Sequence, residues 1–173
     1  MALRIRPERP ADAPGVRRVV EAAFGRPQEA DLVDALRRGG RVALALVAVL
    51  DGEIVGHVLF SPVAVRSPDA ADGDWAALAL GPLAVAPAHQ RRGIGSRLVR
   101  RGLTACRRAG HGVVVVLGHP AYYPRFGFRP AAPLGVRSDF RVPDDVFMLL
   151  ELVPGALGGR RGTVRYAPEF RQA

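Results

Sequence analysis

A short run of residues, Gln90-Arg91-Arg92-Gly93-Ile94-Gly95, places two arginines and two glycines directly before an amphipathic segment. The first turn of a helix leaves backbone N–H groups unpaired, and the helix dipole gives that end a partial positive charge. Glycines let a phosphate approach those amides closely, and the two arginines add formal charge beside them. The run therefore predicts a binding site for a pyrophosphate group.

Two common nucleotide-binding motifs do not fit this run. A dinucleotide-binding fingerprint needs a third glycine where Leu98 stands, and an acidic residue roughly 20 positions further on, where the apolar run Val113 to Leu117 lies. A P-loop contains Gly-Lys-Ser or Gly-Lys-Thr, and this chain contains no lysine. The predicted pyrophosphate therefore belongs to a different class of cofactor.

A strand and a helix are expected to position the run. Trp75 to Val85 is apolar, but Gly81-Pro82 interrupts it, so a bulge or a break is expected because proline cannot donate to a sheet ladder. A helix is expected from Ile94 to Arg108, because small and apolar residues recur there every four positions while its arginines lie largely on the opposite side. Cys106 lies on the apolar side of this helix and is expected in the core.

The other expected elements follow from periodicity and turn residues. Asp12 is expected to cap a first helix, and the turn Asp51-Gly52 is expected to join two strands. The expected segments are strands at Arg4 to Arg6, Val42 to Leu50, Glu53 to Val65, Val113 to Leu117 and Val146 to Val153, and a helix at Glu29 to Arg37. The order β-αα-βββ-α-β-(short α)-β predicts an α/β chain with a mixed sheet and mostly antiparallel hairpins.

The pyrophosphate run resembles the signature of the GNAT (Gcn5-related) N-acetyltransferase superfamily, Gln/Arg-x-x-Gly-x-Gly/Ala. Leu83-Ala84-Val85-Ala86-Pro87 looks like the fourth strand of that family, and Tyr123-Pro124-Arg125-Phe126-Gly127-Phe128 matches its Tyr-x-x-x-Gly-Phe box. Further segments resemble the YhbS-like branch of predicted acetyltransferases, so that the resemblance covers nearly the whole chain: Gly56 to Pro62, Pro120 to Tyr123 and Val153 to Leu157.

The resemblance implies a fold and a co-substrate. The implied fold is a single GNAT domain over residues 1–173, with a central, mostly antiparallel sheet of about six to seven strands, helices on both faces, and a splay between strands 4 and 5. The implied activity is transfer of an acetyl group from acetyl-CoA to a primary amine, directly within a ternary complex. The Gly81-Pro82 pair offers an independent physical reason for a distorted fourth strand.

The resemblance also implies the residues of the cofactor site. The backbone of Leu83, Ala84 and Val85 would hydrogen-bond the pantetheine arm. The pyrophosphate would be bound by the residues of the loop and helix start, Gln90, Arg91, Arg92, Gly93, Ile94, Gly95 and Ser96. No cluster of His, Cys, Asp and Glu has the spacing of a metal site, so no metal is expected.

The general acid of the family corresponds to Tyr123. A thiolate leaves when an amine attacks the thioester, and a phenol with an unperturbed pKa of about 10 can give that thiolate a proton without being ionised at neutral pH. Tyr122 is adjacent, and which of the two tyrosines faces the thioester stays open. The fourth strand contains no Glu or Asp to act as base, which leaves His57, His119 or an ordered water chain as alternatives.

Composition limits the function classes. All 25 basic residues are arginine, which fits the coding bias of a genome rich in G and C. The formal net charge of +9 favours a phosphate-containing ligand and would repel polycations unless the acceptor groove is acidic. The candidates for such a groove are Glu53, Asp69, Asp72 and Asp74. No apolar run reaches the roughly 18 residues of a membrane span, no secretory signal is seen, and the lone Cys106 fits a reducing compartment, so a cytoplasmic protein is expected.

Two other functions remain as alternatives to the acetyltransferase. A non-catalytic acyl-CoA sensor on the same fold is supported by the missing acid in the fourth strand. A basic nucleic-acid-binding module is supported by the charge, but aromatic residues form only 6% of the chain and are not interleaved with the arginines. We therefore expect an amine acceptor, no nucleic-acid or membrane partner, and a monomer or homodimer.

Overall fold

The computed structural model describes residues 2–172, which form nine strands and three α-helices. These residues divide into two compact units. The first unit comprises the chain up to Ser61, the segment Gly81–Ala105 and the C-terminal segment from Pro168. The second unit comprises Pro62–Leu80 and Cys106–Ala167.

The strands of the first unit are neighbours in the sheet in the order in which they occur along the chain. They are β1 (Leu3–Pro7), β2 (Leu44–Leu50), the first part of β3 (Glu53–Arg66) and the last part of β4 (Trp75–Val85), paired in that order. The β1–β2 and β2–β3 pairs are antiparallel. Asp51 and Gly52 have φ values of 51° and 79°, which suits the two-residue hairpin turn expected there.

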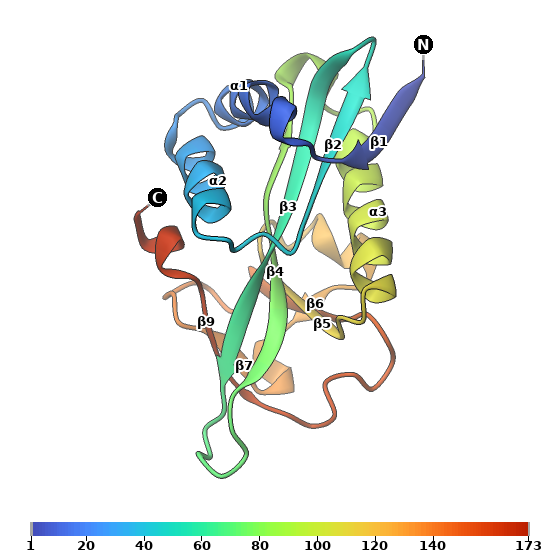
Figure 1. Cartoon of the computed structure of the whole chain (residues 1–173). Coiled ribbons are helices and arrows are strands. Elements are labelled where there is room, and N and C mark those ends of the chain that lie inside the picture. Colours follow the sequence, from blue (N-terminus) through green and yellow to red (C-terminus); the bar gives the residue numbers. More distant parts are fainter. Residues whose placement is uncertain (1, 173) are drawn as a thin grey trace. The chain divides into compact units, whose positions relative to one another are not determined.

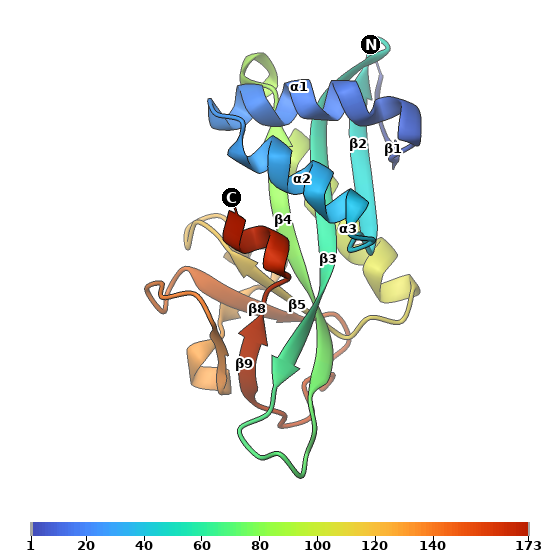
Figure 2. The ribbon, with the colours of Figure 1, turned by 60° about the vertical axis from the view of Figure 1, so that its left-hand side comes forward.

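Helices cover both faces of β2 and β3 in the first unit. The helices α1 (Ala13–Phe24) and α2 (Gln28–Arg38) lie on one face and α3 (Ile94–Arg108) lies on the other (Figures 1 and 2). Successive residues of β3 point to opposite faces. A Cβ on Gly56 would lie 2.9 Å from Leu98 of α3, whereas His57 contacts Glu8 and thereby the α2 side.

Close packing between α3 and β3 requires a glycine at position 102. A Cβ built on Gly102 would overlap the ring of Phe60, which is fully buried. Forcing extra atoms into a packed core costs about 1–3 kcal/mol, and alanine regains only about 1 kcal/mol of helix propensity. Gly102→Ala is therefore expected to lower the free energy of unfolding, measured by urea titration.

Gly15 of α1 offers a matched control for this prediction. A Cβ at Gly15 meets only the flexible end of the Ile54 side chain, at 3.0 Å. Gly15→Ala is therefore expected to leave stability unchanged or raise it slightly. Equal effects of the two substitutions would show that the contact between Gly102 and Phe60 does not limit the packing of α3.

The second unit holds the remaining strand pairs. The first part of β4 pairs in parallel with β5 (Val113–Leu117), β5 pairs antiparallel with β8 (Phe147–Glu151), and β8 pairs with β6 (Arg129–Pro130). The end of β3 pairs with β9 (Gly162–Arg165), which pairs in parallel with β7 (Val136–Ser138).

The splay expected between the fourth and fifth strands is confirmed. The pairing of β4 with β5 runs from Leu78 opposite Val114 to Leu80 opposite Val116. It ends directly before Gly81-Pro82, which are joined by a cis peptide bond, and β4 itself continues to Val85. The expected interruption at Gly81-Pro82 therefore ends the pairing of β4 with β5, while β4 itself continues as a strand.

The expected fold class is confirmed, with corrections in detail. The described residues contain nine strands because β6, β7 and β9 are two to four residues long, too short for a periodic pattern. The short helix after β5 is a 3-10 helix at Tyr123–Phe126. Asp12 is the N-cap residue of α1, as expected, but its carboxylate accepts the Arg9 N–H at 2.7 Å and binds Arg6 instead of capping the helix. No helix among the described residues has the length and apolarity needed to cross a membrane.

Candidate active site

The loop between β4 and α3 is held by hydrogen bonds within the first unit. The Gln90 side chain donates from Nε2 to the Val85 carbonyl at 3.0 Å, and the Ala86 N–H donates to the Val55 carbonyl of β3 at 2.8 Å. Arg91 and Gly93 have φ values of 64° and 80°. The loop therefore follows a defined path in which position 93 favours glycine.

The start of α3 presents backbone amides at its open end. The Arg97 N–H donates to the Gly93 carbonyl at 3.0 Å, which is the first hydrogen bond of the helix. The amides of Ile94 and Gly95 come before this bond and have no acceptor within the helix. Nothing lies within 4 Å of a Cβ built on Gly93, so space beside these amides is open in the described residues.

The charge around this helix start is positive. Arg91 and Arg92 are exposed, and Arg92 Nη1 lies 3.5 Å from His89 Nδ1. No Asp or Glu occurs in residues 91–108, whereas Arg17 of α1 and Arg37 of α2 are bound by carboxylates, as in the pair Arg17–Asp34 at 2.8 Å. The helix dipole, the open amides and the two arginines together suit a pyrophosphate.

The expected pantetheine-binding residues lie in the last part of β4. Ala84 is buried, and Leu83 and Val85 are half-buried. The Gln90 side chain occupies one acceptor position of the Val85 carbonyl, which ties this strand end to the pyrophosphate loop. The structure thus brings together in the first unit all the cofactor-binding residues expected from the sequence.

The two candidate acids lie in the second unit, just after β5. The Tyr123 ring packs against Gly118, where a Cβ would overlap it, and lies edge-on to Phe128 with ring centroids 5.7 Å apart. Burial, followed by the neighbouring Tyr122, raises the pKa of the Tyr123 phenol. A phenol with a raised pKa keeps its proton at neutral pH and can donate it to a departing thiolate.

Tyr122 has different surroundings. It is half-buried, with the Arg125 guanidinium 4.3 Å from the ring centroid and the Arg125 Nε donating to the Tyr122 carbonyl at 2.8 Å. Its ring meets Tyr123 edge-on at 5.1 Å. His119 accepts the Ala121 N–H on Nδ1 at 3.2 Å, so this histidine helps to form the turn that carries both tyrosines.

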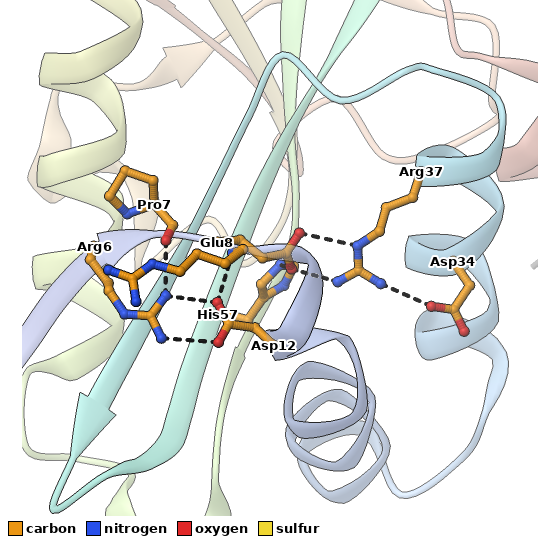
Figure 3. Close-up of polar contacts among 8 residues, drawn as sticks. Arg6, Pro7, Glu8, Asp12, Asp34, Arg37 and His57 are labelled. Carbon is orange, nitrogen blue, oxygen red and sulfur yellow. Dashed lines mark hydrogen bonds and ion pairs between the residues drawn. The ribbon is translucent and has the colours of Figure 1, made fainter.

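His57, one of the alternatives for the base, is fully buried in a charged cluster (Figure 3). Its Nε2 lies 3.0 Å from Glu8 Oε1, and Arg37 binds both oxygens of Glu8 and, at 2.9 Å, Asp34. Burial raises the pKa of Glu8, but the contacts with His57 and Arg37 outweigh it and lower that pKa to about 2. Glu8 is therefore a carboxylate at neutral pH.

Sequence reasoning missed this cluster because its partners are distant in the chain. Glu8 follows β1, Arg37 lies in α2 and His57 lies in β3. The histidine in an apolar strand was the available signal, since a buried polar group needs a partner. The cluster joins three elements of the first unit and gives His57 a structural environment.

The fold and the pyrophosphate loop define the class of protein. The family model described as "Acetyltransferase (GNAT) domain" matches residues 4–131, and the chain belongs to this family of acyltransferases. It is 38% identical to the N-acetyltransferase YhbS of Escherichia coli K12 over 169 residues, which cover 97% of this chain and 98% of YhbS. It is 40% identical to YjhQ of the same organism over 138 residues, 78% of this chain and 75% of YjhQ.

Two solved structures carry the same fold. The crystal structure of E. coli YhbS in complex with CoA has a TM-score of 0.90 and 37% identity, covering 98% of this chain and 92% of that one. A GNAT acetyltransferase from Brucella melitensis in complex with acetyl-CoA has a TM-score of 0.79 and 36% identity, covering 98% of both chains. These similarities extend beyond the motifs to the whole length of the chain.

Proposed function

We propose that this chain transfers an acetyl group from acetyl-CoA to a primary amine, by direct attack of the amine within a ternary complex. The observation that carries the proposal is the start of α3, where open amides and two arginines form a site for a pyrophosphate. Relatives of the same fold hold CoA and acetyl-CoA, which supports acetyl-CoA as the co-substrate.

The first unit supplies the cofactor contacts in this proposal. Arg91, Arg92 and the amides of Gly93 to Ser96 bind the pyrophosphate, and Gln90 fixes the loop to Val85. The backbone of Leu83, Ala84 and Val85 binds the pantetheine arm. A backbone N–H near Val85 polarises the thioester carbonyl and stabilises the oxyanion that forms on it.

The reaction forms one bond and breaks another. The amine, having lost one proton to solvent, bonds through its nitrogen to the acetyl carbon, the carbon–sulfur bond breaks, and Tyr123 gives its proton to the departing thiolate. The nitrogen then loses its second proton, which restores the Tyr123 phenol. Cys106 is not an acyl carrier in this scheme, because it is buried in α3 and burial raises its pKa to about 11. We assign His57 to the buried cluster with Glu8 and do not route the proton of the amine through it.

Calorimetric titration of acetyl-CoA, with NADH and ATP as controls, tests the cofactor site. We expect acetyl-CoA to bind with a micromolar Kd and NADH and ATP not to bind. Gly93→Leu is expected to weaken it by about 10- to 100-fold, because a side chain displaces the phosphate from charge-assisted hydrogen bonds worth about 1.5–3 kcal/mol.

Gly25→Leu is the matched control for the Gly93 variant. Gly25 ends α1 with a φ of 69° and has nothing within 4 Å of a built Cβ, so its backbone strain is comparable to that at Gly93. We expect its acetyl-CoA affinity to equal that of the unmodified chain. Equal loss in both variants, or no acetyl-CoA binding at all, would overturn the proposed cofactor site.

An acyl-CoA sensor on the same fold is the second candidate. It is favoured by the absence of Asp and Glu from Trp75–Val85, because no carboxylate of this strand can act as a base. Unlike the enzyme, a sensor would bind acyl-CoA without catalysing a reaction. The single-domain organisation of residues 1–173, the cytoplasmic location and the oligomeric state expected from the sequence stay predictions.

A further inference from the structure

A small cavity in the second unit lies beside β7 and the loop after it. Its volume is about 220 Å³, below the roughly 300–1,000 Å³ of pockets for drug-sized ligands, so it suits a ligand of amino-acid size. Apolar side chains and charged side chains both line it. Its apolar lining residues include Val136, Phe140 and Phe147, and its charged lining residues are Arg137, Arg141 and Asp144.

Backbone pairing places one lining residue of this cavity at the end of β5 that precedes Tyr123. Phe147, which lines the cavity, pairs with Leu117 at the end of β5, and neighbouring strands lie about 4.8 Å apart. The next residue, Gly118, donates its N–H to the Val146 carbonyl at 3.0 Å and packs against the Tyr123 ring. The cavity wall and the proposed acid therefore flank the same end of β5.

A larger cavity of the second unit does not share this position. It has a volume of about 620 Å³ and is lined by the turn between β3 and β4, including Asp69, Asp72 and Asp74. Trp75, which also lines it, begins β4, and β4 runs parallel to β5 with Leu80 opposite Val116. Trp75 lies five positions before Leu80, so this cavity lies about 16 Å along the strand from the Tyr123 end.

The smaller cavity carries positive charge available to a ligand. Arg137 and Arg141 are exposed, and neither forms an ion pair with a carboxylate among residues 2–172. By contrast, Arg129 of the same unit binds Glu151 at 3.1 Å. The planar guanidinium matches the geometry of a carboxylate or a phosphate and forms charge-assisted hydrogen bonds with it. The two arginines and Asp144 together give the lining of the cavity one net positive charge.

We propose that the acceptor is a small amine that also carries a carboxylate or phosphate beside an apolar group, and that Arg137 and Arg141 bind this anion. The inference rests on the proposed acetyltransferase function. Phe140 and Phe147 contact the apolar part of the acceptor, and polyamines are disfavoured by the charge of the site. The protonated amine loses one proton to solvent and gains the acetyl group, and CoA leaves as the thiol.

Matched pairs of amines test the preference for an anion. In one pair, para-aminomethylbenzoate is compared with its carboxamide; in the other, phosphoethanolamine is compared with ethanolamine. We expect at least one anionic amine to have a kcat/KM about 10- to 100-fold above its neutral partner, and spermidine to be poorer than either anion. The two pairs show whether carboxylate or phosphate is preferred.

The double variant Arg137→Gln/Arg141→Gln tests the assignment of the anion site. It is expected to lose the preference through a higher KM for the anionic amine, with kcat and the KM for the neutral amine nearly unchanged. Arg66→Gln/Arg165→Gln is the control, because it removes two exposed arginines from the paired strands β3 and β9 of the same unit and changes net charge equally. Its preference should match that of the unmodified chain.

Equilibrium binding of the same amines to the CoA-loaded protein separates the two claims. If anionic amines bind more tightly than neutral ones but nothing is acetylated, the proposed enzyme activity fails and the anion site stands. If amines are acetylated without preference for the anion, or if the double variant keeps the preference, the anion site is wrong and the enzyme stands. Equal binding of anionic and neutral amines overturns the anion site whether or not turnover occurs.

Discussion

Replacing Tyr123 with phenylalanine is expected to lower kcat by about 100- to 10,000-fold, the usual contribution of a positioned proton donor. The substitution removes the phenolic hydrogen and keeps the ring that packs against Gly118 and Phe128. Acetyl-CoA affinity should not change, because the cofactor contacts proposed above come from β4 and the start of α3. The measurement is thiol release at saturating acetyl-CoA and amine, combined with calorimetric titration of acetyl-CoA.

Tyr122→Phe is the matched control for this prediction. It removes the same atom from the neighbouring ring, which is half-buried and lies under Arg125. We expect a kcat close to that of the unmodified chain. A large loss in Tyr122→Phe with full turnover in Tyr123→Phe would transfer the role of the acid to Tyr122. Full turnover in both would remove the tyrosines from the chemistry.

Replacing Glu8 with alanine is expected to lower the free energy of unfolding by about 3–5 kcal/mol at neutral pH, the usual cost of breaking a buried ion pair. Its carboxylate is bound by Arg37 from α2 and lies 3.0 Å from the fully buried His57 (Figure 3). Without Glu8, the fully buried His57 ring loses the carboxylate beside it, and the Arg37 guanidinium keeps only Asp34 as a partner among residues 2–172. Urea unfolding measures the difference.

Asp31→Ala is the control, because the Asp31 carboxylate is 63% exposed where it binds Arg17. Exposed ion pairs contribute little to stability, so we expect almost no change in the urea midpoint. If Glu8→Ala were as mild as Asp31→Ala, the buried cluster would not anchor β1, α2 and β3 to one another.

The same carboxylate predicts how stability depends on pH. Glu8 has a pKa of about 2 in the folded chain and 4.5 as its ordinary value, so its stabilising contribution is fully present above pH 4.5 and is lost as the pH falls towards 2. A difference of this size corresponds to about 3 kcal/mol. The partners of the Glu8 carboxylate are the Arg37 guanidinium and the His57 ring, with Asp34 on the far side of Arg37.

Unfolding of the unmodified chain and of Glu8→Gln across this pH range measures that contribution. The stability difference between the two proteins should be largest near neutral pH and should shrink below pH 4.5, where Glu8 binds a proton in the unfolded state first. A difference that stays constant down to pH 2 would mean that the Glu8 pKa is not lowered by the cluster.

The elements around the cofactor site were predictable because their signals are local. The helix from Ile94 to Arg108 has the expected bounds, since its apolar side repeats every four residues and glycines stand at both ends. Leu83 to Val85 lie at the end of a strand and are followed by a loop and then by that helix, which is the order expected from the sequence. The family, its fold and its class of activity, all expected from these local motifs, are confirmed by the family model and by the relatives.

The rest depended on contacts between distant residues. β9 pairs with β3 about a hundred positions earlier, and a strand of four residues carries no readable period of its own. The partners of His57 were hidden because Glu8 and Arg37 have no shared motif. The cavity at Arg137 and Phe147 combines a loop with a neighbouring strand, so only the folded chain brings its lining together.

Mass spectrometry of an amine mixture incubated with acetyl-CoA, with the released CoA thiol counted in the same reaction, tests the central claim most directly. We predict that an acetylated amine accumulates in equal amount to the CoA released, and that both fall together in Gly93→Leu and in Tyr123→Phe. If acetyl-CoA binds while no amine is acetylated by the unmodified protein, the enzyme assignment is contradicted and the chain is an acyl-CoA sensor.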